Sequence, residues 1–152
     1  MIRNVLAPKR SESTEDAIIT ERSTQEEKSL KILLAEDNEI NQMVATNILK
    51  QAGHTYVIAN NGQEALDKWQ KEPFDLILMD IHMPIMDGFE ATSLIRDAEK
   101  NLGSHIQIVA LTANAIKGDA ERCIAGGMDG YLSKPFTRAE LLDTINGFAP
   151  IS

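Results

Sequence analysis

The sequence has little cysteine, no excess of basic residues and no long hydrophobic run. Its one cysteine, Cys123, cannot form an internal disulfide, which favours a reducing compartment and excludes a disulfide-stabilised secreted fold. Its 15 basic residues are outnumbered by 23 acidic ones, for a formal net charge of −8. Binding to nucleic-acid phosphates requires a basic surface, so nucleic acid is not an expected partner.

Membrane insertion is not expected either. No apolar run approaches the roughly 20 residues needed to cross a bilayer, and the amino terminus lacks the apolar core of a secretory signal peptide. The composition, with 43% hydrophobic and 25% charged residues, is that of a soluble globular protein. We therefore expect a cytoplasmic chain.

The domain organisation follows from a change of pattern near residue 30. Residues 1–29 are rich in Ser, Thr, Glu, Arg and Gln and have no sustained apolar stripe, which predicts a flexible linker or tail. Residues 30–148 carry regular apolar segments of the length that fills one domain. Residues 149–152 are too few for more than a tail.

Strand and helix patterns alternate along this domain. We expect strands at 31–35, 56–59, 76–79, 106–111 and 130–133, and helices at about 39–52, between Gly62 and Pro73, at about 89–101, at 115–125, and after a capping box at 137–140. The strands read as apolar on both faces, which is typical of a parallel sheet covered on both sides. Five such alternations predict a doubly wound α/β domain with a five-stranded parallel sheet and five helices.

Polar residues stand where these strands end. Glu36 and Asp37 follow the first strand, Asp80 ends the third, Thr112 ends the fourth and Lys134 follows the fifth. Each taken alone has a structural explanation, as a helix cap or a solvated loop residue. Because the carboxyl ends of parallel strands share one edge of the sheet, where ligands bind, their joint occurrence predicts a convergent site.

The residue types indicate phosphoryl chemistry with a hard cation. Three neighbouring carboxylates repel one another unless a cation lies among them, and carboxylates with a carbonyl oxygen suit Mg²⁺. Zinc is not expected, since the three histidines lack ligand spacing and there is one cysteine. Asp80 beside a metal ion and Lys134 is suited to attack phosphorus and form an aspartyl phosphate.

Residues 30–148 resemble the receiver domain of two-component response regulators. The resemblance is carried by the acidic pair Glu36-Asp37, the segment from Asp80 through Met83-Pro84 to Asp87-Gly88, Leu111-Thr112-Ala113 and Lys134-Pro135. It implies a flavodoxin-like fold with strand order 2-1-3-4-5.

The resemblance also implies roles for individual residues. Asp80 is expected to be the phosphoacceptor, and Mg²⁺ is expected between Glu36, Asp37, Asp80 and the backbone carbonyl of His82. Thr112 and Lys134 are expected to contact the phosphoryl group.

A conformational switch is implied as well. Tyr131 occupies the position of the family's switch aromatic residue, which turns inward when Thr112 moves. Lys134-Pro135 is expected to be a cis peptide. His82 borders the expected pocket and is predicted to tune the rate of dephosphorylation.

The motifs favour one context within the family. Glu36-Asp37-Asn38, His82-Met83-Pro84 and Leu111 to Ala115 are more similar to receivers of hybrid histidine kinases than to those joined to DNA-binding domains. The expected partner is a histidine kinase or a histidine phosphotransfer protein, and the expected role is phosphorelay signalling. In that context the chain is a receiver within a larger protein, and it could be tethered to a membrane-bound sensor kinase. The alternative is a free-standing response regulator. A phosphorylation-dependent dimer through the fourth helix, fifth strand and fifth helix is also left open.

The first helix carries a candidate docking surface. Its expected core arc comprises Val44, Ala45, Ile48, Leu49 and Ala52. Ile40 and Met43 lie beyond that arc, at the helix end nearest Asp37. We expect them, together with Pro135, to contact a phosphotransfer partner; the alternative is packing at the edge of the core.

Two other functions fit parts of the sequence. Haloacid-dehalogenase-like phosphatases also form an aspartyl phosphate, but they place a second Asp two residues after the nucleophile, where this sequence has His82. We also do not expect a cap domain within residues 30–148. A degenerate receiver that only binds proteins is disfavoured by the intact set of site residues.

Overall fold

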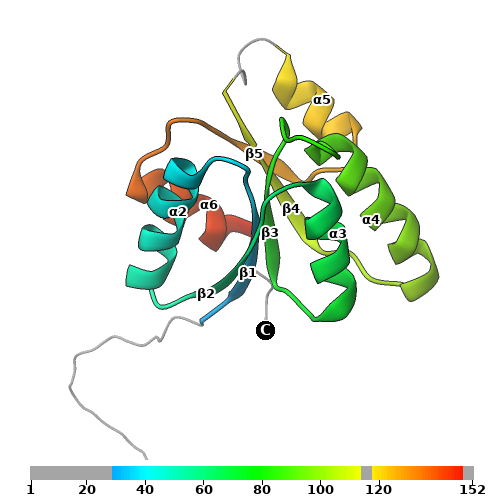
Figure 1. Ribbon diagram of the computed structural model, residues 1–152, viewed down its shortest axis with the longest axis horizontal. Helices are drawn as coiled ribbons and strands as arrows, with labels where there is room; N and C mark the ends of the chain where they lie inside the picture. The colour runs from blue at the N-terminus through cyan, green and yellow to red at the C-terminus, as the bar shows by residue number, and fades with distance from the viewer. Residues whose placement is uncertain (1–28, 114–117, 149–152) are drawn as a thin grey trace, which may run out of the picture.

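The computed structural model of the protein describes residues 29–113 and 118–148 (Figure 1). The expected tail at 149–152, nearly all of the expected linker and the start of the helix expected at 115 lie outside the described residues. None of the described helices is long and apolar enough to span a membrane.

Five parallel strands form one sheet in the order β2-β1-β3-β4-β5, which confirms the expected topology. The strands are β1 (Lys31–Ala35), β2 (Thr55–Ala59), β3 (Leu76–Asp80), β4 (Gln107–Thr112) and β5 (Gly130–Ser133). Every residue of the central strand β3 is buried, because helices cover both faces of the sheet. Asp80 is the last residue of that strand, one position later than the strand predicted from its apolar run.

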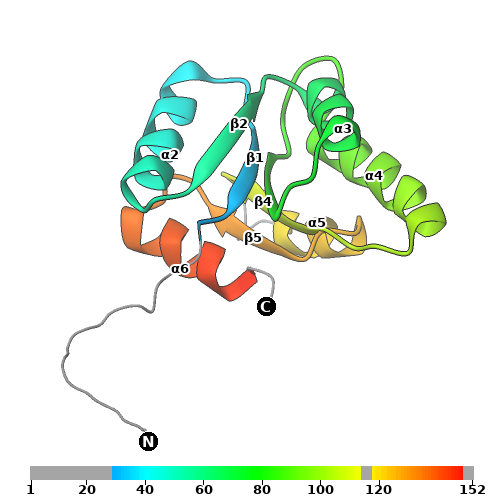
Figure 2. The same ribbon diagram turned by 90° about the horizontal axis from the view of Figure 1, so that it is seen from below.

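The helices form two layers. On one face lie α2 (Glu39–Gln51) and α6 (Arg138–Phe148), and on the other α3 (Gly62–Lys71), α4 (Gly88–Leu102) and α5 (Asp119–Ala125) (Figures 1 and 2). Alternate strand residues face the two layers, so that Leu33 and Ile77 belong to one core and Ile32 and Leu78 to the other. The strand patterns that predicted burial on both sides are thereby explained.

Side-chain caps determine where the helices begin. Asn38, Asn61 and Asp87 each accept a hydrogen bond from the backbone N–H three residues later, which satisfies one of the unpaired amides of the first turn. The predicted capping box is confirmed: the Thr137 N–H donates to Glu140 Oε1 and the Glu140 N–H to Thr137 Oγ1, at 2.9 and 3.1 Å. Each of these capped helices follows a strand of the parallel sheet, so the strand-to-helix loops lie at one edge.

One residue of α2 differs from the prediction. Ala45 and Leu49 are buried as expected, but Val44, which was assigned to the core arc, is 45% exposed. Val44 and Ala45 line a groove of about 100 Å³ between α2 and the loop that follows β5. The assignment of Val44 to the core was therefore wrong, because the helical period contains no information about this groove.

A cluster of ionisable residues connects α4 to the start of β4, at the amino-terminal edge of the sheet. We call Arg96, Glu99, His105 and Asp129 the amino-edge cluster. Arg96 lies 2.6 Å from Glu99 and 2.8 Å from Asp129, and His105 lies 2.6 Å from Asp129. The two carboxylates also accept the backbone N–H groups of residues 106 and 108, so each negative charge in this cluster has a donor.

Candidate functional site

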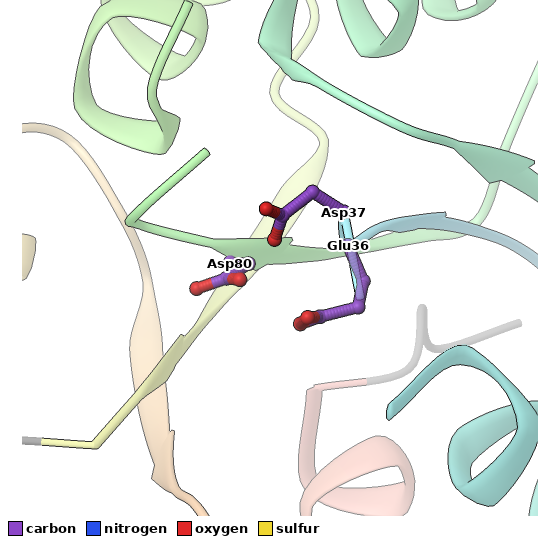
Figure 3. Close-up of side chains that lie close together, drawn as sticks. All are labelled: Glu36, Asp37 and Asp80. Carbon is purple, nitrogen blue, oxygen red and sulfur yellow. The ribbon is translucent and has the colours of Figure 1, made fainter. Parts of the chain in front are cut away.

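Three carboxylates converge at the opposite, carboxyl-terminal edge of the sheet. Glu36 and Asp37 follow β1, Asp80 ends the neighbouring strand β3, and their side chains point toward a common space (Figure 3). Ligand oxygens of all three lie within 4.8 Å of one another. Glu36 and Asp80 are buried and Asp37 is exposed, so the group opens to solvent on one side.

The backbone after Asp80 is held close to the strand end. Gly88, the first residue of α4, donates its N–H to the Ile81 carbonyl at 3.2 Å. A Cβ at Gly88 would lie only 2.4 Å from the Asp80 carbonyl oxygen, so this approach requires glycine. The Asp-Gly pair of the loop is thus needed to cap α4 with Asp87 and to fit its first residue against Asp80.

Lys134 reaches this group from the loop after β5. Its Nζ atom lies 3.4 Å from Glu36 Oε2 and 3.4 Å from Asp80 Oδ2, and its backbone N–H donates to the Thr112 carbonyl. The Lys134-Pro135 peptide is cis, as the resemblance implied. We call Glu36, Asp37, Asp80 and Lys134 the carboxyl-edge cluster, in which one cation faces three carboxylates.

Glu36 is fixed on its other side by the start of α2. Asn41 Nδ2 donates to Glu36 Oε1 at 3.1 Å, and the Asn38 N–H lies 3.4 Å from the same oxygen. The second oxygen is left facing Lys134. The Asn residues that follow the acidic pair in the sequence therefore orient its buried member.

This environment raises the pKa of Asp80 to about 7. Burial of the carboxylate is the largest cause, and the hydrogen bond and negative charge of Glu36 add to it; Lys134 and the His82 backbone N–H, 3.2 Å from Oδ1, oppose it. The cluster thus carries more negative charge than its own lysine neutralises. Such an excess favours binding of a cation.

The two expected switch residues lie on the neighbouring strands β4 and β5. Thr112 is fully buried at the end of β4, whereas Tyr131 is 47% exposed. Thr112 Oγ1 donates at 3.0 Å to Oδ2 of Asp119, a buried carboxylate at the start of α5. The sequence pattern does not single out Asp119, because an acidic residue in the first turn of a helix is expected for the helix dipole alone.

The expected docking residues are accessible. Ile40 and Met43 are 71% and 63% exposed, and Pro135 is also exposed. The alternative of packing at the core edge therefore does not apply to Ile40 or Met43. The side chain of His82 is exposed as well, and its backbone lies beside Asp80.

Sequence comparison places this chain among signalling proteins. The family model described as the response regulator receiver domain matches residues 32–146. A stretch of hybrid signal transduction histidine kinase I of Dictyostelium discoideum is 44% identical over 121 residues, covering 76% of this chain and 7% of that protein. A probable histidine kinase 1 of Oryza sativa subsp. indica is 39% identical over 149 residues, covering 79% of this chain and 15% of that protein. The chain thus spans a small part of these relatives.

Solved structures agree. The receiver domain of the sensor histidine kinase PA1611 of Pseudomonas aeruginosa PAO1, which has a magnesium ion coordinated in its active site cleft, is 40% identical with a TM-score of 0.73, over 80% of this chain and 98% of that one. The receiver domain of the Saccharomyces cerevisiae response regulator Ssk1, crystallised with the histidine phosphotransfer protein Ypd1, is 34% identical with a TM-score of 0.76, over 80% and 89% of the two chains. The chain belongs to the response regulator receiver domain family.

Proposed function

We propose that this domain accepts a phosphoryl group from a phosphohistidine onto Asp80 and passes it on or releases it by hydrolysis, as the receiver of a hybrid histidine kinase in a phosphorelay. The observation that carries the proposal is the carboxyl-edge cluster, in which a buried carboxylate at a strand end lies beside two others and a lysine. The alternative is a free-standing response regulator with the same chemistry.

Asp80 is the nucleophile in this proposal. A carboxylate oxygen of Asp80 forms a bond to phosphorus while the bond from phosphorus to the histidine nitrogen breaks, and the imidazole leaves with that electron pair. Lys134, 3.4 Å from Asp80 Oδ2, is placed to neutralise charge on the phosphoryl oxygens. Hydrolysis then needs only water as the second acceptor.

The donor set fits Mg²⁺. Glu36, Asp37, Asp80 and the backbone carbonyl of His82 are the oxygen ligands that we propose for it, and all three side chains lie within 4.8 Å. Mg²⁺ supplies neutralisation of the carboxylates and of the incoming phosphoryl oxygens. With the ion absent, the pKa of Asp80 near 7 leaves part of the nucleophile protonated at neutral pH, so cation binding and ionisation of Asp80 are linked.

The proposed context of the domain, within a longer signalling protein, comes from its relatives. The histidine kinases reported above carry a segment similar to this chain, and Ssk1 binds a phosphotransfer protein. We propose that residues 30–148 are the signalling unit, that residues 1–29 link it to another part of a longer protein, and that 149–152 form a short tail. The partner is then a histidine kinase or a histidine phosphotransfer protein in the cytoplasm.

We propose Thr112 and Tyr131 as the switch. Thr112 donates its hydroxyl to a phosphoryl oxygen after transfer, and Tyr131, now half exposed, turns inward into the space vacated. The changed face comprises α5, β5 and α6, through which a phosphorylation-dependent dimer can form.

Phosphorylation of Asp80 is tested by intact-mass measurement. Incubation with Mg²⁺ and a small phosphodonor is expected to add one phosphate to the wild type and none to Asp80→Asn. The control is Asp87→Asn, which changes a nearby carboxylate that caps α4 and should still accept phosphate. No mass gain in the wild type would favour a protein-binding module without phosphorylation, and steady turnover of phosphomonoesters would favour a phosphatase.

The docking surface that we propose comprises Ile40, Met43 and Pro135. Ile40 and Met43 present large apolar side chains to solvent near the carboxyl-edge cluster, and Pro135 lines the adjoining groove together with Val44. An apolar face of a phosphotransfer helix placed there would bring its phosphohistidine to Asp80.

This surface is tested by separating partner-dependent from partner-independent transfer. Ile40→Asp is expected to slow phosphotransfer from a histidine phosphotransfer protein at least tenfold, with unchanged phosphorylation by a small donor. Leu102→Asp is the matched control, because Leu102 is 67% exposed at the far end of α4. Equal slowing of both reactions by Ile40→Asp would contradict the assignment.

A further inference from the structure

A fourth carboxylate near the acceptor edge lies outside the carboxyl-edge cluster and holds the switch threonine. Asp119 Oδ2 accepts the Thr112 hydroxyl at 3.0 Å, and both residues are buried. Its other oxygen lies 3.5 Å from Arg122 NH1, and His82 Nε2 lies 4.0 Å from Oδ2. Asp119 thus contacts Thr112, which we propose as a donor to the phosphoryl group, and lies near the side chain of His82, two residues after Asp80.

A hydroxyl group has one proton to donate. Thr112 therefore cannot donate to Asp119 and to a phosphoryl oxygen on Asp80 at the same time. We propose that Asp119 is a positioning residue that opposes activation: it retains the Thr112 hydroxyl in the resting state, and a phosphoryl group must compete with it for that proton. This inference rests on the proposed role of Thr112 as the donor to the phosphoryl group.

A role for Asp119 in capping α5 does not account for its position. The residue before the helix, Gly118, makes no side-chain cap bond. Among the described residues, the Asp119 carboxylate is bonded to the side chains of Thr112 and Arg122 and not to a backbone amide of α5. Glu121 is the other acidic residue of the same turn, and it is exposed. Both residues are acidic and lie in the first turn of α5, but it is Asp119 that bonds Thr112.

Release of the hydroxyl would leave a buried carboxylate short of a donor, which is costly unless another donor replaces it. Arg122 is placed to do this. Its side chain is 64% exposed, lies beside Asp119 and stacks over the Phe89 ring at 4.6 Å. We call the hydrogen-bonded pair Thr112 and Asp119 the latch. Because Arg122 can replace Thr112 as donor, the latch is reversible, and loss of its hydrogen bond changes the contacts of α5 at its amino-terminal end.

The test uses binding of beryllofluoride, a phosphoryl analogue, with Mg²⁺ on the whole chain, measured by calorimetry. Asp119→Ala is expected to lower the half-saturating beryllofluoride concentration about threefold to tenfold, because the competing acceptor is gone. Glu121→Ala should leave it unchanged. Asp119→Asn keeps an acceptor without the charge, so a smaller shift in the same direction is expected, and it replaces the alanine variant if that variant does not fold.

A double-mutant cycle determines whether the effect passes through Thr112. In a Thr112→Ala background, Asp119→Ala should no longer change beryllofluoride affinity. Unchanged or weaker binding by folded Asp119→Ala with Thr112 present, or the same gain in both backgrounds, would overturn the latch. Failure of the proposed function is distinct: the wild type would then not bind beryllofluoride, or Asp80→Asn would bind it equally well.

Discussion

The amino-edge and carboxyl-edge clusters lie at opposite edges of the same parallel sheet and differ in how completely their carboxylates are paired with donors. In the amino-edge cluster, ion pairs of 2.6 to 2.8 Å and backbone N–H groups satisfy the carboxylates of Glu99 and Asp129. In the carboxyl-edge cluster, one lysine lies 3.4 Å from each of two buried carboxylates. The pKa of Asp80 is raised, not lowered, by this environment.

This difference in pairing indicates which cluster stabilises the fold and which is suited to chemistry. A buried charge network whose donors and acceptors are all matched resists change and ties elements together. A buried carboxylate that its surroundings do not neutralise destabilises the folded protein, and a cation that binds to it stabilises the folded state. Perturbed carboxylates in a cleft are accordingly candidates for function, and the amino-edge cluster is a structural clamp.

The largest expected effect comes from breaking the matched cluster. Arg96→Met leaves the buried Glu99 and the half-buried Asp129 without their cation, so we expect a loss of about 3–5 kcal/mol in the free energy of unfolding, measured by urea denaturation. Lys100→Met removes an exposed partner of Asp97 on the same helix and should cost under about 1 kcal/mol. Equal losses from both variants would contradict the distinction.

A smaller effect of opposite sign is expected in the carboxyl-edge cluster. Asp80→Asn should raise the free energy of unfolding by about 1–3 kcal/mol at pH 8 without divalent cations, because the neutral amide avoids the cost of a buried charge beside Glu36. Added Mg²⁺ should reduce this advantage by stabilising the wild type. Loss of stability in the variant under metal-free conditions would contradict our account of the cluster.

The difference in stability between the wild type and Asp80→Asn should depend on pH. The pKa of Asp80 is about 7 in the folded protein and near its ordinary value of 3.8 when unfolded, so the folded state binds the proton more tightly between these values. The stability contributed by protonated Asp80 is fully present below pH 4 and is lost as the pH rises through 7. Urea denaturation with EDTA should therefore show wild-type stability falling relative to Asp80→Asn between pH 5 and 8.

The smallest expected effect concerns the exposed member of the matched cluster. The side chain of His105 is 53% exposed and pairs with one oxygen of Asp129, whose other oxygen is already held by Arg96 and the Ile108 N–H. His105→Gln should cost less than about 1 kcal/mol, measured in the same denaturation series. A loss as large as that of Arg96→Met would make His105 an essential part of the clamp.

The sequence was sufficient to predict the architecture and the convergent edge. Apolar strands with polar ends, Asn and Asp caps and the Thr137-Glu140 box are local signals, and parallel pairing then brings Glu36, Asp80 and Lys134 to one edge. The strand order came from the resemblance, because spacing alone does not distinguish between ways of ordering parallel strands.

Pairings between distant side chains were not predictable. Asp119 lies seven residues after Thr112, and the residue pattern between them does not specify that the two side chains meet. Asp129 meets Arg96 across 33 positions, and no period in either segment marks the contact. The exposure of Val44 depends on a groove bounded by a loop some 90 residues away in the chain, which a helical arc cannot represent.

Lys134 and Glu36 are 98 positions apart in the chain, and this separation has a consequence during translation. A ribosome releases the residues of β1 and β3, with their three acidic side chains, long before it releases the lysine that faces them. Copies that end early, or that are cleaved before β5, contain the acidic residues but have no complete acceptor. Only a chain that includes β5 and Lys134 therefore completes the carboxyl-edge cluster.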